Sequence, residues 1–203
     1  AAAAPSVHLD RVGGSLLAFF LAVGLGAHAL DEFQGRPLRT SIPSGLLLAI
    51  AAISLTGALT IGVLAVLTIS PWAVPFVLFG GFIVLAYNLE LGRGRFHSDL
   101  WFGLAWGGFP ALVGYWANAE RLDTQAFLIA TACFLLSLVQ RTLSNQARGL
   151  RRNARSATGH IEFAEGHVEA ITIPYILAVP ERALRLLSLS VTLLAVGWLV
   201  ARL

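Results

Sequence analysis

Five polar residues follow the first long apolar run of this chain, and their types suit metal and phosphate chemistry. They are His28, Asp31, Glu32, Arg36 and Arg39. If the preceding helix continues through this segment, His28, Glu32 and Arg36 share one face at four-residue spacing, with Asp31 beside His28. The carboxylates could then hold Mg²⁺ while the arginines bind a phosphate. The alternative is a capped helix end with a local ion pair, and the spacing does not separate the two.

A second basic segment contains two arginines among glycines. Gly92 and Gly94 allow tight turns of the backbone, and Arg93 and Arg95 could contact the same anion as the first pair of arginines. The simpler interpretation is an ordinary basic loop in which Asp99 caps the next helix. Taken alone, this segment favours the simpler interpretation.

A third polar segment follows the fifth apolar run. It contains Asn145 and several arginines, and then a stretch from His160 to Ala170 whose residues alternate about Glu165 and Gly166. This alternation predicts a small β-hairpin. Its histidines and glutamates could ligate a metal, but a solvated hairpin is the preferred interpretation.

These segments interrupt a chain with the composition of an integral membrane protein. Hydrophobic residues make up 57% and charged residues 12%, whereas about a quarter of the residues in a soluble domain are charged. We expect one domain over residues 1–203, because no linker divides the chain. The basic residues are all arginines at the borders of apolar runs, which indicates membrane topology rather than nucleic-acid binding.

The apolar runs predict about six transmembrane helices, because a helix needs roughly 20 residues to cross the bilayer. The expected fold is therefore an all-α polytopic bundle with a small cytoplasmic β-hairpin in its last loop. The short apolar piece over 171–179, which contains Pro174 and is followed by Pro180, predicts a separate half-helix or an interfacial lead-in. The six spans are Gly13–Leu30, Gly45–Ile69, Trp72–Leu89, Leu100–Asn118, Thr124–Val139 and Ala183–Val200.

Alternating these spans across the membrane collects three loops on one side, at residues 31–44, 90–99 and 140–170. Of the fourteen basic residues, only Arg11, Arg121 and Arg202 fall on the opposite side. The positive-inside rule therefore predicts that the three loops are cytoplasmic and the amino terminus is outside. We expect the protein in the cell (inner) membrane.

Several short sequences resemble the UbiA superfamily of intramembrane prenyltransferases over roughly residues 22–139. The segment Arg36-Pro37-Leu38 through Ile42-Pro43-Ser44-Gly45 looks like the Arg-Pro…Pro-Ser-Gly connection of that family. Two later segments also look similar to the family pattern. One is Ala86-Tyr87-Asn88, which precedes a basic loop, and the other is the run from Asp99 through Pro110 to Tyr115, which contains glycines and a proline.

The resemblance implies a prenyl diphosphate bound with Mg²⁺ at the cytoplasmic face. In this interpretation His28, Asp31 and Glu32 are the metal ligands, and Asp31 and Glu32 are also catalytic. The family has a second aspartate-rich motif after the fifth span, where this chain has no carboxylate between Gln140 and Arg148. The residues that would bind the substrate are Arg36, Arg39, Tyr87, Asn88, Arg93, Arg95 and Asn145.

The sequence leaves two main functions open. One is prenyl transfer from an isoprenoid diphosphate to an acceptor in the membrane. The other keeps the fold without the chemistry: a protein that holds an isoprenoid, quinone or pigment, or a structural subunit beside other membrane subunits. The missing second motif supports this alternative. A haem subunit using His28 and His97 is a weaker third possibility, because both histidines fall near the same face.

Overall fold

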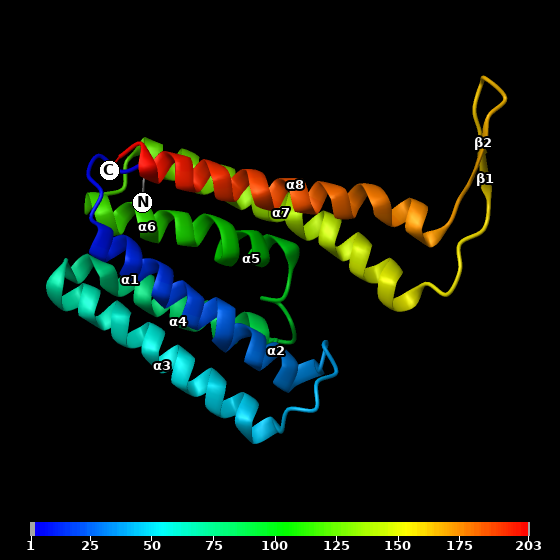
Figure 1. Cartoon of the computed structure of the whole chain (residues 1–203). Coiled ribbons are helices and arrows are strands. Elements are labelled where there is room, and N and C mark those ends of the chain that lie inside the picture. Colours follow the sequence, from blue (N-terminus) through cyan, green and yellow to red (C-terminus); the bar gives the residue numbers. More distant parts are fainter. Residues whose placement is uncertain (1–2, 203) are drawn as a thin grey trace. The chain divides into compact units, whose positions relative to one another are not determined.

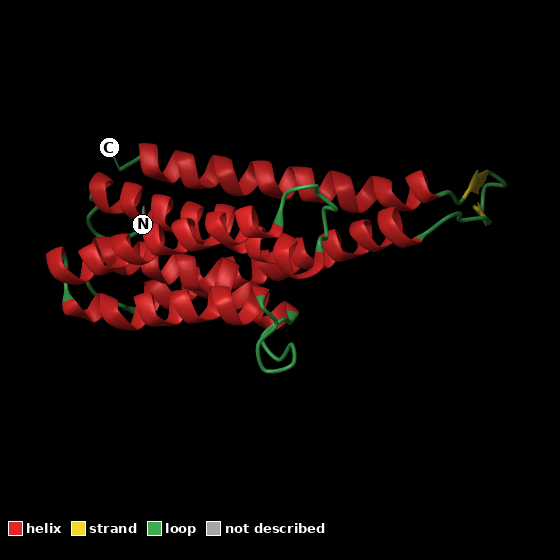
Figure 2. Ribbon diagram, turned by 90° about the horizontal axis from the view of Figure 1, so that it is seen from below, coloured by secondary structure: helices red, strands yellow, loops and turns green. Residues whose placement is uncertain are grey.

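A computed structural model describes residues 3–202, and most of them are helical (Figure 1; Figure 2). The chain forms two compact units, one ending at Ser137 and the other beginning at Leu138; they are called unit 1 and unit 2 here. Five helices are long and apolar enough to cross a membrane, and a two-stranded sheet lies in unit 2. The predicted all-α membrane bundle with a β-hairpin is confirmed.

Unit 1 begins with one continuous helical run made of α1 (Leu9–Phe19), the π-helical segment η1 (Phe20–Ala27) and α2 (His28–Gly35). The run ends where Arg36 takes a left-handed conformation, with φ of 46°. The helix therefore extends beyond Leu30, as the first polar segment requires, but it stops before Arg36.

The next two helices form a hairpin. α3 (Ser44–Thr68) is followed by a turn at Ser70, whose side chain accepts a hydrogen bond from the Trp72 amide, and then by the 3₁₀ segment η2 (Pro71–Ala73) and α4 (Val74–Asn88). Proline suits the first position of a helix because its missing N–H would have no partner there. α3 also packs along η1, which places the first three predicted spans side by side (Figure 1).

The fourth predicted span is a continuous helical run with a π-helical centre. It consists of α5 (Asp99–Gly103), η3 (Leu104–Gly108) and α6 (Phe109–Ala119). It forms where predicted, but it is not among the five helices that satisfy both the length and the hydropathy of a span. A Cβ on Gly107 would lie only 2.5 Å from the Cys133 carbonyl oxygen. Glycine therefore permits close helix packing here, as small residues commonly do in membrane proteins.

α7 (Thr124–Asn153) and α8 (Ile173–Val200) correct two predictions. Residues 140–153 are helical rather than part of a loop, because α7 continues as an amphipathic helix beyond its apolar run. The separate half-helix over 171–179 was wrong, since α8 runs unbroken through Pro180. A proline can be tolerated within such a helix when its neighbours satisfy the freed backbone groups.

The predicted hairpin is present in unit 2. β1 (His160–Glu162) pairs antiparallel with β2 (Val168–Ala170), and Ile161 lies opposite Glu169. The hairpin is mostly solvent-exposed, and His167 lies 3.3 Å from the Glu169 carboxylate. This agrees with the interpretation of a solvated hairpin.

Candidate functional site

Glu32 is buried at the end of the first helical run and binds the loop that follows. One carboxylate oxygen accepts hydrogen bonds from the Thr40 amide at 2.7 Å and the Thr40 hydroxyl at 2.8 Å. The other accepts from the Leu38 amide at 2.9 Å. The side chain is only 3% exposed. Glu32 therefore fixes the loop over residues 36–43 and directs both oxygens to it.

Arg36 stabilises the same loop from its other side. Its guanidinium donates to the carbonyl oxygens of Thr40 and Ile42, both at 2.9 Å, and to the Ser44 hydroxyl at 3.0 Å. These bonds hold the left-handed backbone at Arg36, which a non-glycine residue rarely adopts. The predicted stack of Arg36 on one helix face with His28 and Glu32 does not form, because the helix ends at Gly35. Arg39 is exposed on this loop.

The three predicted metal ligands do not form a coordination group in this arrangement. His28 is exposed, Asp31 is half-buried, and both oxygens of Glu32 accept hydrogen bonds from the loop. Among residues 3–202, no group of three or more His, Cys, Asp or Glu side chains is placed to hold a metal. Mg²⁺ needs several oxygen ligands in near-octahedral geometry, so these residues do not fit the ion.

Tyr87 and Asn88 are buried at the same end of unit 1, which we call the loop end: the end that carries the loops over 36–43 and 89–98. The Asn88 amide donates to the Val84 carbonyl of its own helix at 2.7 Å. Tyr87 stacks on His97 with ring centroids 4.4 Å apart and contacts Trp106 at 4.7 Å. This aromatic row anchors the second basic loop, and the sequence did not single out its partner Trp106.

The remaining predicted substrate ligands lie outside this buried network. Arg93 and Arg95 are both exposed on the loop over 89–98, and Arg93 has a left-handed φ of 62°. Asn145 belongs to unit 2, where its side chain accepts a hydrogen bond from Arg148 at 2.7 Å. Of the residues predicted to bind a phosphate, Arg36 is thus engaged by its own loop, whereas Arg39, Arg93 and Arg95 are exposed at the loop end.

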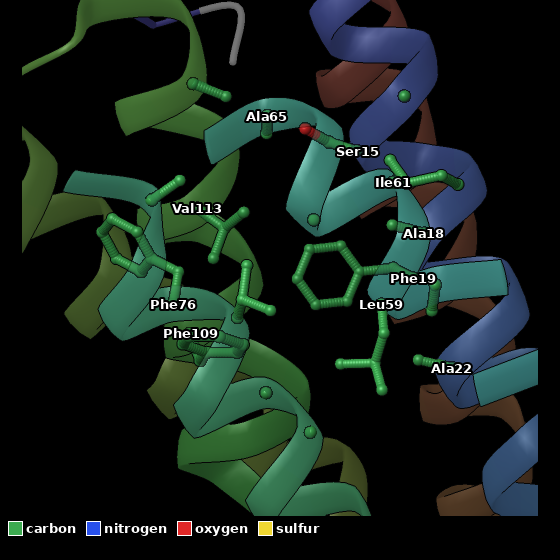
Figure 3. Close-up of a pocket in the computed structure, with 18 of the residues that line it drawn as sticks. Ser15, Ala18, Phe19, Ala22, Leu59, Ile61, Ala65, Phe76, Phe109 and Val113 are labelled. Carbon is green, nitrogen blue, oxygen red and sulfur yellow. The ribbon is translucent and has the colours of Figure 1, made fainter. Parts of the chain in front are cut away.

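Unit 1 contains a large apolar cavity that the sequence did not predict. Its volume is about 540 Å³, within the usual range of roughly 300–1,000 Å³ for small-molecule sites. Side chains of α1, η1, α3, α4, η3 and α6 line it, and Figure 3 shows the Phe19 ring projecting into its centre. Phe109 contacts Phe19 at 6.0 Å and Phe76 at 6.3 Å between ring centroids. Aromatic and aliphatic groups thus form almost the whole wall.

The cavity is long and is bordered by packed residues toward the loop end. Its lining runs along the first helical run from Asp10 to Val23, a length of about 20 Å at 1.5 Å per residue. Toward the loop end, Ala27, Leu30 and Ala51 belong to a packed cluster that also includes Val84. At the other end, Trp116 and Ala117 of a second packed cluster line the cavity themselves, as do Asp10 and Arg11.

The side of the cavity is bordered by apolar residues that are also exposed on the outer surface. Leu59, Leu78 and Phe82 line it and are also exposed on the outer surface, by 42%, 68% and 47%. In a membrane-spanning helix, such apolar surface faces lipid. These side chains give a membrane-soluble ligand a direct route into the cavity from the bilayer.

Few polar groups face the cavity, and they lie away from the loop end. The Ser15 hydroxyl projects toward it (Figure 3), and Asp10 and Arg11 lie at its edge. Arg11 binds the Ala117 carbonyl at 3.0 Å and the Glu120 carboxylate at 2.7 Å. The arginine charge is therefore compensated within the protein, so the cavity suits a ligand with a small uncharged head group.

No short motif marks the cavity, because apolar residues recur in every span and glycines in most of them. Its only sequence signal is the number of small and aromatic residues in the first, third and fourth runs. Comparison with protein-family models, with curated proteins and with solved structures gave no match to this chain.

Proposed function

We propose that this membrane protein binds an elongated, membrane-soluble lipid of the isoprenoid or quinone type in the cavity of unit 1. The observation that carries the proposal is the apolar cavity of about 540 Å³, which a packed cluster borders toward the loop end and exposed apolar side chains border at its side. A preformed apolar site bounded by aromatic rings favours a long hydrocarbon chain over a water-borne substrate. The Ser15 hydroxyl is the polar group best placed to meet a quinone carbonyl or an alcohol.

The packed cluster around Ala27, Leu30 and Ala51 favours binding over prenyl transfer. It lies between the cavity and the loop end, where the predicted diphosphate ligands Arg36 and Arg39 are found. A prenyl diphosphate held in this cavity would be separated from those arginines by the cluster. Holding a neutral lipid requires no rearrangement of this cluster.

A prenyltransferase of the UbiA type is the second candidate. It is supported by the local concentration of His28, Asp31 and basic residues at the loop end, in the part of the chain that resembles the family. Under this candidate the diphosphate binds at the loop end, and the cluster separating that end from the cavity must open. The carboxylates and imidazole present do not fit Mg²⁺ in the arrangement described above.

Lipid identification separates the two candidates. We expect the purified protein to retain an isoprenoid or quinone lipid, which extraction and mass spectrometry would detect. The amount of lipid per protein should fall when cavity residues are changed and stay the same when His28 or Asp31 is changed. We expect no pyrophosphate release from geranylgeranyl diphosphate with Mg²⁺. Release that is lost in Asp31→Asn would establish the enzyme instead, and retention of ordinary phospholipids alone would remove support for the binding site.

A further inference from the structure

The polar residues that line the cavity of unit 1 are gathered at one end. Among residues 3–202, the charged and hydroxyl-bearing side chains of the lining are Asp10, Arg11, Ser15 and Thr68. The first three lie near the start of the first helical run, and Thr68 ends α3, which runs back from the loop end. The cavity therefore has a polar end opposite the loop end, and its remaining wall is apolar.

Arg11 and Ser15 lie on the face of α1 that borders the cavity. They are one helical turn apart, so their side chains share this face. The face continues with Ala18 and Ala22, which also line the cavity. A ligand lying along α1 thus meets two polar groups at one end and hydrocarbon side chains beyond them.

The end of α6 holds Arg11 in place. A single guanidinium nitrogen, Nη1, donates to the Ala117 carbonyl at 3.0 Å and to the Glu120 carboxylate at 2.7 Å. The segment before α1 is fixed to the same helix end, because the His8 amide donates to the buried Asn118 side chain at 2.7 Å. A side chain that is already ordered loses little entropy when a ligand binds.

Arg11 and Ser15 both keep hydrogen-bonding capacity. An arginine has five N–H donors, and among residues 3–202 the Nε and Nη2 atoms of Arg11 have no acceptor. The Ser15 hydroxyl projects toward the cavity (Figure 3) and has no hydrogen-bond partner in the same part of the chain. The Thr68 hydroxyl, by contrast, donates to the Leu64 carbonyl of its own helix at 2.8 Å. An oxygen atom of a ligand can therefore bind at Arg11 and Ser15.

The charges at the polar end favour an uncharged ligand. Glu120 neutralises Arg11 through an ion pair, and Asp10 adds a second carboxylate to this end of the cavity. The Arg11 side chain is only 19% exposed, so salt screens its interactions less than those of a surface charge. An anionic head group would meet two carboxylates and one guanidinium, whereas an alcohol or a carbonyl needs only the donors.

We propose that Arg11 and Ser15 form a head-group subsite for an alcohol or a quinone carbonyl, and that Glu120 disfavours anionic head groups there. The inference rests on the proposed function, because it gives an orientation to the lipid in the same cavity. The head group lies opposite the loop end, and the hydrocarbon chain extends toward Val84 and Leu85, which line the cavity near the end of α4.

The test uses three ligands with one branched isoprenoid chain. Phytane has no head group, phytanol has a hydroxyl group and phytanate has a carboxylate. Binding of each radiolabelled ligand to the purified full-length protein is measured in detergent, in alkaline buffer that keeps phytanate ionised. We expect the wild type to bind phytanol about tenfold more tightly than phytanate.

Two variants test the donors. Ser15→Ala removes one hydroxyl, and Arg11→Lys keeps the positive charge but leaves a single nitrogen for Ala117, Glu120 and the ligand. Each should weaken phytanol binding about fivefold, the usual effect of one hydrogen bond, and leave phytane binding unchanged. The matched controls are Ser188→Ala on α8 and Arg121→Lys, neither of which lines the cavity, and both should bind all three ligands like the wild type.

A third variant tests the charge. Glu120→Gln keeps an acceptor oxygen for Arg11 and removes one negative charge, so it should strengthen phytanate binding about fivefold and leave phytanol binding within about twofold. Its control is Glu165→Gln in the exposed hairpin, which should change neither affinity.

The outcomes separate this inference from the proposed function. Unchanged phytanol binding in both Ser15→Ala and Arg11→Lys, or phytanate bound as tightly as phytanol by the wild type, would overturn the head-group subsite even though phytane binds. If the wild type binds none of the three ligands, the proposed function fails and this inference fails with it. Should Arg11→Lys fold poorly, Ser15→Ala decides between the outcomes, because it removes a single oxygen from a half-buried position.

Discussion

Replacing Ala18 by phenylalanine should block the cavity of unit 1 near its middle. Ala18 lies on α1 and lines the cavity close to Phe19 (Figure 3). It is eight residues from Asp10 and five from Val23, which mark the limits of the cavity along this run; the distances are about 12 Å and 8 Å at 1.5 Å per residue. A benzyl group at this position would divide the cavity into two short pockets.

The expected loss of affinity follows from the length of ligand displaced. Each CH₂ group moved from water into an apolar site contributes about 0.8 kcal/mol. A ring at position 18 displaces at least three or four carbons of a chain lying along the cavity, which corresponds to about 3 kcal/mol. Since each 1.4 kcal/mol is a factor of ten, binding should weaken by about 100-fold.

Tryptophan fluorescence provides the assay. Trp106 and Trp116 both line the cavity, so decyl-ubiquinone bound there should quench their emission. The control is Leu17→Phe, which adds a ring at the adjacent, 51% exposed position and should leave affinity within about twofold, because single surface changes are usually small in effect.

Two results would contradict the interpretation. Equal affinity of Ala18→Phe and the wild type would refute the assignment of the ligand to this cavity. Equal loss in Leu17→Phe would point to binding on the outer surface instead. Should Ala18→Phe be poorly folded, Ala65→Phe on α3 introduces a ring into the same cavity from the facing helix and should reproduce the loss.

Three further changes test the loop, the packing and the turn. Glu32→Gln replaces one acceptor oxygen by an NH₂ donor that faces a backbone amide, so the loop that contains Arg39 should be held less firmly. Trypsin should then cleave after Arg39 about tenfold faster than in the wild type. An unchanged cleavage rate would contradict the role of Glu32 in holding the loop. Gly107→Ala should destabilise the protein by about 1–3 kcal/mol in chemical denaturation, whereas Gly149→Ala, with open space around it, should not destabilise it. The hydrogen bond from the Ala126 amide, together with the Tyr115 hydroxyl and Arg121, lowers the pKa of Asp123. The Asp123 carboxylate therefore stabilises the fold fully above the ordinary Asp pKa of about 3.9. This stabilisation is lost as the pH falls through the lower pKa of the folded state. Melting temperatures of Asp123→Asn and wild type should differ at neutral pH and converge in acid, and a constant difference would argue against this linkage.

Most of the fold could be predicted from the sequence because membrane helices have a strong local signal. About 20 apolar residues in a row specify a helix that satisfies its own backbone hydrogen bonds in lipid, and the runs containing Leu47, Ile83 and Phe134 all became helices. The alternation around Glu165 likewise specified the hairpin. The errors fell at prolines and polar helix ends. Pro180 does not stop α8, and the local sequence could not predict this because it does not reveal whether neighbouring groups satisfy the carbonyl that the proline leaves unpaired.

For the candidate site, the sequence could predict which side chains are chemically suited to bind a ligand. The types and order of His28, Asp31, Glu32 and Arg36 are sequence facts. Their partners depend on the loop that folds back between them, because Glu32 accepts hydrogen bonds from the amides of Leu38 and Thr40. Hydrogen bonds between residues six and eight positions apart need a specific turn, and spacing along a helix does not predict it.

The sequence by itself determined that this is a membrane protein made of apolar helices, with its basic residues grouped at their borders. Only the tertiary structure decided what those helices enclose. Phe19, Phe76 and Phe109 line the cavity from three helices that are distant in sequence, and the cavity volume depends on how all the lining side chains fill the space between the helices. Apolar residues that face lipid and apolar residues that face a cavity look alike in a sequence, since both avoid water; packing alone separates them.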